Sequence, residues 1–469
     1  MISFRLAVPA ILLLLPGCIV GPNHVLPEFA LPAKFSEGRS RSIGDVGGNT
    51  WWAAYDDKKL DSLIRAGLNQ NLDVQEALER INSAAANVTI AGAGAFPSLT
   101  LSGFHTVSGE TGEVRQQKET RNATGGELTL SWLLDLFGLH RRNTESAQAA
   151  LESSYASVEM ARLAYIQDLV SSYIDLRYYQ QRLALSRANL KSRQETYDLT
   201  KFQLEAGAAS RLDVVQAEGL VKQIVAEIPG LEINSRASAH HIALLLGLPA
   251  GTLVAELERS SGQPAFRGGI DAGIPADLIR DRPDIRKAER DLASATAQIG
   301  VAEAQLYPSI SISGSITPTY TNRDGSHGDI TSWTFGPSLN LPVFDGGRLR
   351  ANVEVQKSNS KVAYLVWKAA VLNAVEQVEN ALSAIHRDAR TVEALRNQVK
   401  TAQETLELST ASYKDGASSL LDVLEAQRSV SDTQASLAVA IQQWAKDHAV
   451  LNIALGGGAT MGTTTRPRN

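Results

Sequence analysis

Apolar residues recur at helical spacing over two very long stretches of the chain. Two sets of four residues step by three, four and three positions: Leu163, Ile166, Val170, Tyr173, and Val362, Leu365, Ala369, Leu372. Because this spacing places each set on one helix face, it predicts helices over 141–206 and 348–414. At 1.5 Å per residue, each would be a rod of about 100 Å, far longer than a globular helix. A filament or a stalk would have the same rhythm.

Alternating apolar and polar residues predict four strands, near 98–107, 127–136, 309–318 and 331–341. In the third strand, isoleucines share one face, and serine and threonine take the other. About ten residues is the length of a transmembrane strand. Half-buried strands of a soluble sheet are the alternative, because such a signal is weak in any one strand. The uncharged Ser/Thr face favours a water-filled lumen.

The four strands would form two hairpins with long polar loops over 108–126 and 320–330. Four strands cannot close a barrel, for which about eight are the practical minimum. Open edges in lipid would leave backbone groups without hydrogen bonds. A membrane barrel would therefore be shared between chains. Two copies would supply about eight strands, and three would supply about twelve, with room for a lumen.

The chain is a tandem duplication. Residues 96–103 (FPSLTLSG) recur as 307–314 (YPSISISG), and 207–217 (GAASRLDVVQA) recur as 416–426 (GASSLLDVLEA). Each half would contain a helix, two strands and two long helices. The helices not yet named are predicted over 57–92, 210–246, 275–306 and 418–455. The two repeats then cover 57–247 and 275–456, joined by a Gly/Pro-rich connector over 248–274.

Composition and charge remove several classes of function. The 469 residues carry a net charge of −5, which gives no support to nucleic-acid binding. A mean hydropathy of −0.12 excludes a helical membrane bundle. The eight histidines have no metal-binding spacing, and no catalytic or nucleotide-binding motif occurs, so we expect no enzyme, metal or cofactor. Without a nucleotide site, the chain would not energise transport itself.

The single cysteine, Cys18, stands at the end of a secretory leader. Residues 1–17 contain one positive charge and an apolar run too short to span a bilayer. The run ends in Leu15-Pro16-Gly17-Cys18, which resembles a bacterial lipobox, in which the cysteine is lipidated and becomes the mature N-terminus. Ile19 after the lipobox implies sorting to the outer membrane. An ordinary signal peptide is the alternative. We therefore expect a signal peptide over 1–17, a lipidated extension over 18–56, and a disordered tail over 457–469.

Further motifs are spread over the whole mature chain. They include Trp51-Trp52, Asn71-Leu72-Asp73, Leu134-Asp135-Leu136-Phe137-Gly138, Arg282-Pro283-Asp284-Ile285 and Pro342-Val343-Phe344-Asp345-Gly346-Gly347-Arg348. As an ordered set they resemble outer membrane factors of the TolC/OprM type, in the NodT-like lipoprotein subgroup. One departure is Leu139, where the family usually has arginine.

The resemblance implies a mainly helical chain with transmembrane β-strands that forms a homotrimer. Four strands per chain would form a twelve-stranded barrel in the cell outer membrane, continued by a long α-helical barrel through the periplasm. The resemblance also implies a tripartite efflux system with a periplasmic adaptor and an inner-membrane pump of the RND type. The channel would passively conduct drugs, solvents or metal ions to the exterior. A type I protein-secretion duct is one alternative, and a stalk without conductance is another.

The resemblance also gives roles to residues at two helix turns. Both turns would form the periplasmic tip that contacts the adaptor, through Gly207, Ser210 and Leu212 in the first turn and Gly416, Ser419 and Leu421 in the second. Beyond the second turn, Leu421, Glu425 and Arg428 lie on one helix face. By resemblance this face lines the closed periplasmic gate, narrowed by the leucine and latched by the charged pair. The alternative for that pair is a solvated ion pair of little energy.

Overall fold

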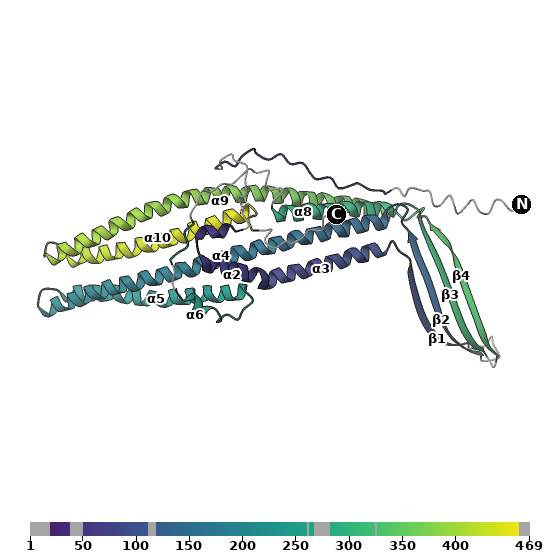
Figure 1. Ribbon diagram of the computed structural model, residues 1–469, viewed down its shortest axis with the longest axis horizontal. Helices are drawn as coiled ribbons and strands as arrows, with labels where there is room; N and C mark the ends of the chain where they lie inside the picture. Colours follow the sequence, from purple (N-terminus) through teal and green to yellow (C-terminus); the bar gives the residue numbers. More distant parts are fainter. Residues whose placement is uncertain are drawn as a thin grey trace. The chain divides into compact units, whose positions relative to one another are not determined.

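The computed structural model describes residues 19–37, 50–110, 119–259, 262–266, 282–323 and 326–458. Over these residues the chain is mainly helical, with one antiparallel sheet of four strands (Figure 1). It packs as two compact units. The first unit combines Met1–Glu28, Arg80–Tyr155 and Lys287–Lys368, and the second combines Phe29–Glu79, Ala156–Arg286 and Ala369–Asn469. Each unit therefore takes segments from both halves of the duplicated chain.

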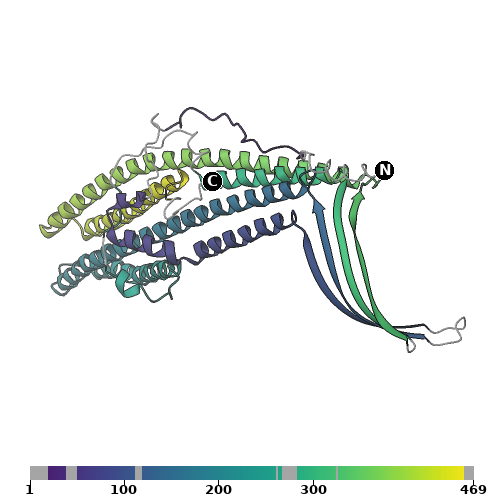
Figure 2. The same cartoon turned by 45° about the vertical axis from the view of Figure 1, so that its right-hand side comes forward.

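The sheet belongs to the first unit and has the strand order β1-β2-β3-β4. Its strands are β1 (Ser98–Glu110), β2 (Glu119–Leu134), β3 (Ser309–Arg323) and β4 (Ser326–Asn340). The central pair joins the two repeats, because Leu134 of β2 lies opposite Ile310 of β3. Both Figure 1 and Figure 2 show the four strands as one curved layer.

The strands are longer than the alternating pattern predicts, so the prediction of long polar loops is wrong. Strand pairing continues through Ser108, which lies opposite Arg121, and through Tyr320, which lies opposite Asp329. Residues 111–118 and 324–325 lie outside the described residues. Ladder hydrogen bonds join backbone groups and need no apolar side chains. The alternation therefore marks only the part of each strand that has an apolar face.

One face of the sheet leaves large apolar side chains exposed on the single chain. They are Leu99, Leu101, Ile316, Trp333, Phe335 and Leu339. An exposed apolar patch of this kind on a sheet marks a surface that is covered by another apolar phase or by a partner. The alternation predicted from the sequence is therefore present, but no part of the described chain covers this face.

The helix predicted over 57–92 is two helices, α2 (Lys58–Gln70) and α3 (Leu72–Ala93), so the single-helix prediction is wrong. The break is at Asn71, whose backbone is extended. Its side-chain oxygen accepts a hydrogen bond from the Val74 amide at 3.1 Å, and its amide nitrogen donates to the Leu245 carbonyl at 2.9 Å. Asparagine is a strong N-cap residue, and here it ends one helix and starts the next.

The long helices match their predictions closely. They are α4 (Leu139–Glu205), α5 (Arg211–Leu245), α9 (Arg348–Lys414) and α10 (Leu420–Ala454). Within the second unit, α4 runs beside α5 and α9 beside α10, as two antiparallel hairpins (Figures 1 and 2). The shorter elements are η1 (Trp51–Tyr55), α6 (Val254–Leu257) and α8 (Pro283–Ala304). Of the helices that the structure describes, none is long and apolar enough to cross a membrane.

Two observations change the predicted ends of elements. The described helix α8 begins at Pro283, which suits a first helical turn, whereas residues 275–281 of the predicted helix lie outside the described ranges. Gly457, the first residue of the predicted disordered tail, is packed and accepts a hydrogen bond from the Trp51 indole at 3.2 Å. Residues 459–469 lie outside the described ranges.

The second unit buries two titratable side chains, Asp447 and His448, beside an aromatic cluster. The His448 ring stacks on Phe266 at 4.2 Å between centroids and meets Tyr55 edge-on at 5.2 Å. Burial lowers the pKa of His448 to about 4. Burial, and then contact with the Asp388 carboxyl, raise the pKa of Asp447 to about 7. Near neutral pH both side chains therefore resist taking a charge.

The two groups give opposite pH dependences of stability, which can be separated by mutation. Between about pH 4 and 7, Asp447 binds its proton in the folded state but not when unfolded, so it lowers stability as pH rises. Between about pH 6.5 and 4, His448 is protonated only when unfolded, so it lowers stability as pH falls. Relative to wild type, Asp447→Asn should gain stability as pH rises and His448→Gln as pH falls. Each trend is at most about 1.4 kcal/mol per pH unit. Thermal unfolding at a series of pH values measures both, and parallel curves for all three proteins would contradict the assignment.

Candidate functional site: the helix tips and the predicted gate

The first helix turn, between α4 and α5, has the geometry that its sequence predicts. Gly207 has a φ of +75°, a left-handed conformation that glycine adopts without strain. Ser210 caps α5: its hydroxyl accepts from the Asp213 amide at 3.2 Å, and the Asp213 carboxylate accepts from the Ser210 amide at 2.8 Å. Leu212 follows the cap and is 64% exposed.

The second turn, between α9 and α10, repeats this arrangement. Gly416 has a φ of +73°, and Ser419 forms the same reciprocal capping box with Asp422. Leu421 is 54% exposed and corresponds in the repeat to Leu212. The duplicated sequence therefore builds two rigid turns, each of which presents one apolar side chain to solvent on the single chain.

The two turns rest on a shared apolar cluster in the second unit. The cluster joins α5 to α10 and consists of Ala217, Leu220, Leu420 and Leu424, with Tyr197 and Tyr413 packed against it. Leu420 and Leu421 are neighbours in sequence, yet the first is buried and the second is exposed. This difference fixes which leucine could contact another protein.

The structure brings the predicted gate charges together. The Arg428 guanidinium lies 3.2 Å from the Glu425 carboxylate, and both side chains are about half exposed on the single chain. The first hairpin has Gln216 and Gly219 at the equivalent positions, so it lacks this ion pair. The charged pair is therefore a feature of one hairpin only, although the caps and leucines occur in both.

A set of polar contacts near the tips was not predicted from the sequence. Arg193 of α4 is buried, and its guanidinium donates to the Leu220 carbonyl of α5 and to the Ser431 hydroxyl of α10, both at 3.1 Å. Burial lowers the pKa of Arg193. The Tyr413 hydroxyl donates to the Gln203 side chain at 2.5 Å. These bonds tie the second hairpin to the first.

One signal for these contacts was present in the sequence. The buried face of α4 continues after Tyr173 with polar residues: Arg177, Gln180, Ser186, Arg193 and Thr200. A charged residue on a face that elsewhere is apolar indicates a buried partner. The partners themselves come from other helices, and the spacing along α4 cannot name them.

The described residues contain no group of three or more histidine, cysteine or acidic side chains that could hold a metal ion. Cys18, the predicted lipidation site, lies outside the described residues.

The sequence profile of the outer membrane efflux protein family matches residues 63–248 and 274–457. The chain belongs to this family. Nodulation protein T of Rhizobium leguminosarum bv. trifolii is 63% identical to this family member over 97% of both chains. Outer membrane protein OprJ of Pseudomonas aeruginosa is 30% identical, over 91% of this chain and 90% of the relative.

Solved structures of outer-membrane channels have the same fold as this family member. The OprN channel superposes with a TM-score of 0.85 at 29% identity, covering 94% of this chain and 100% of the other. The open state of the MtrE channel of Neisseria gonorrhoeae gives 0.81 at 27% identity, covering 96% and 100%. The family member is thus an outer-membrane efflux channel with a TolC-like fold. The family and the matched structures are channel proteins and not enzymes, as the sequence predicted.

Proposed function

We propose that three copies of this chain form one outer-membrane channel, with a twelve-stranded barrel in the membrane and a helical barrel in the periplasm. The observation that carries this proposal is the four-stranded sheet, whose outer strands β1 and β4 each have one edge without a partner strand among the described residues. The exposed apolar face of the sheet suits lipid. In lipid, an open edge must pair, and the edge strand of the next copy provides that pairing.

The two helix tips dock the channel onto a periplasmic adaptor in this proposal. Leu212 and Leu421 support it, because each is an exposed apolar side chain on a rigid, capped turn. Gly207 and Gly416 set the turn, and Ser210 and Ser419 hold it. An inner-membrane pump of the RND type supplies the energy, and the channel conducts passively.

Leu421, Glu425 and Arg428 form the periplasmic gate in this proposal. Three copies place three leucines and three ion pairs around one axis, which narrows the opening and holds it closed. The absence of the ion pair from the equivalent position of the first hairpin supports the assignment, because a general stabilising device would be expected in both hairpins.

The substrates are small molecules: drugs, solvents or metal ions. Relatives are named for antibiotic efflux, toluene efflux and cation efflux, at 25% to 29% identity. We also propose that Cys18 carries the lipid that anchors the mature chain in the outer membrane. A type I protein-secretion duct is the second candidate for the same channel.

Deletion of the gene tests this function. The mutant should accumulate more of at least one compound from a panel of antibiotics, toluene and copper or silver salts, and a plasmid copy should restore export. Fluorimetry or metal analysis of washed cells measures the accumulation. Normal export of every compound, together with the loss of one secreted protein from the medium, would favour the secretion duct.

A further inference from the structure

The first described residues of the chain are not a loose linker. Residues 19–27 lie against the first unit, in contact with α4 and α8. At Gly21, with a φ of +88°, an added Cβ would lie 2.4 Å from the Gly300 Cα of α8. Only a pair of glycines lets the two backbones approach so closely. We call residues 19–27 the strap.

One buried side chain, Arg142, holds the beginning of the strap. It is 3% exposed, and its guanidinium donates to the carbonyls of Val20 and Gly21, both at 3.0 Å, and to the Asn23 side-chain oxygen at 2.9 Å. Its remaining charge is paired with Glu145 at 2.7 Å. A guanidinium has five donors in a fixed plane, and three of these bonds fix the path of the strap.

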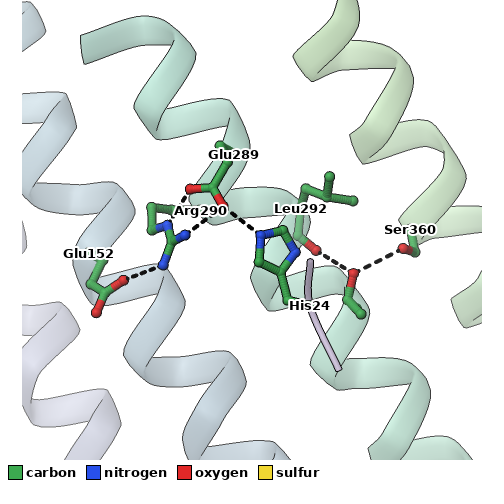
Figure 3. A network of polar contacts seen from close by, with 7 residues as sticks. His24, Glu152, Glu289, Arg290, Leu292 and Ser360 are labelled. Atoms are coloured by element: carbon green, nitrogen blue, oxygen red, sulfur yellow. Dashed lines mark hydrogen bonds and ion pairs between the residues drawn. The ribbon is translucent and has the colours of Figure 1, made fainter. Parts of the chain in front are cut away.

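A second set of contacts holds the strap four residues further on. The His24 ring lies 2.5 Å from the Glu289 carboxylate of α8, which also pairs with Arg290 (Figure 3). Arg290 in turn lies 2.8 Å from Glu152 of α4. Figure 3 shows His24 reaching this network from the thin strap segment, between the helices.

Arg142 holds the strap where the sheet meets the helices. The Val20 amide donates to the Phe137 carbonyl at 3.2 Å, and Phe137 lies between the end of β2 and the start of α4. Ile19 lies against Gly138, where an added Cβ would be 3.0 Å from the Ile19 side chain. The residue before Ile19 is Cys18.

Exposed apolar side chains surround the other connections at this end of the sheet. They precede β1 or follow β4 and are Phe96, Leu341, Val343 and Phe344. We call them the junction collar. Phe344 is 92% exposed and Val343 is 88% exposed. Aromatic and apolar residues at the end of membrane strands are typical of the lipid–water boundary.

We propose that Arg142 positions the lipid anchor: it fixes the chain directly after Cys18 at the junction collar, so that the acyl chains on Cys18 and the collar enter the same membrane leaflet. This inference rests on the proposed lipidation of Cys18. A lipid on a flexible linker would only tether the channel, whereas a lipid held by Arg142 also sets the depth of the channel in the membrane.

Hydrogen exchange of the full-length protein in outer-membrane lipid tests the role of Arg142. Arg142→Gln should speed exchange over residues 19–24 by about tenfold or more, because three hydrogen bonds to a charged donor are lost, and leave the rest of α4 unchanged. Arg142→Lys should restore only part of the protection, since an ammonium cannot make the same three bonds. The matched control is Arg141→Gln, whose arginine contacts Asp135 and should leave the strap protected. Full protection in Arg142→Gln, or equal loss along α4, would overturn the proposal.

Two further measurements separate this inference from the proposed lipidation. Mass spectrometry of the N-terminal peptide shows whether Cys18 carries lipid, and its absence would remove the anchor and with it the positioning role. Cys18→Ser should leave the strap protected, and loss of protection there would mean that the lipid, rather than Arg142, holds it. A nitroxide on Val25→Cys should report one depth in the bilayer in wild type and a spread of depths in Arg142→Gln. An unchanged depth would overturn the positioning role.

Discussion

Replacing Glu425 and Arg428 together with alanine should raise the open probability of the channel in planar bilayers. Each exposed ion pair is worth at most about 1 kcal/mol, so three pairs that break together shift the closed–open equilibrium by roughly fivefold to a hundredfold. Leu421→Ala should add to this, because it widens the opening without touching the charges. Single-channel recording of the purified protein measures both effects.

A surface ion pair of the first hairpin is the matched control. Lys222 and Glu218 of α5 lie 2.8 Å apart and are not among the predicted gate residues. The double alanine variant at these positions should conduct like wild type. If both double variants opened the channel equally, general loosening of the helix tips would explain the result, and Glu425 and Arg428 would not be a gate.

Charged replacements at the two exposed tip leucines should abolish efflux while leaving the channel assembled. Leu212→Asp with Leu421→Asp places a carboxylate on each turn, where an apolar contact with the adaptor would have to desolvate it. Neither side chain lies in the apolar cluster beneath the turns, so the capping boxes and the cluster should persist. Export from intact cells should fall to the level of the deletion strain, and cross-linking to the adaptor should be lost.

Ile233→Asp is the control for this pair. Ile233 is another exposed apolar residue of α5, about 30 Å along the helix from Leu212. This variant should export normally if the tips alone contact the adaptor. Normal export by the tip variant, with cross-linking intact, would remove the leucines from the adaptor contact.

The long helices and their turns were predictable because their signals are local. The period of apolar residues, the glycines and the Ser/Asp capping pairs lie within one or two helical turns of each other, and the structure places all of them as expected. The duplication doubled each signal. The strands were found for the same reason, but only where one face is apolar.

The remaining features depend on contacts between distant parts of the chain. The break at Asn71 is held partly by the Leu245 carbonyl, and Arg193 is satisfied by α5 and α10. The strap is the clearest case, since residues 19–23 look like an ordinary extension until Arg142 is placed beside them. No spacing along the sequence joins these residues, because each pair is brought together by packing.

The conductance of the purified, full-length protein in a planar bilayer tests the central claim most directly. A trimer that inserts and gives discrete current steps, larger in the Glu425→Ala/Arg428→Ala variant, is the predicted result. Particles of one or two chains, or a trimer that leaves the bilayer without current in both proteins, would contradict it.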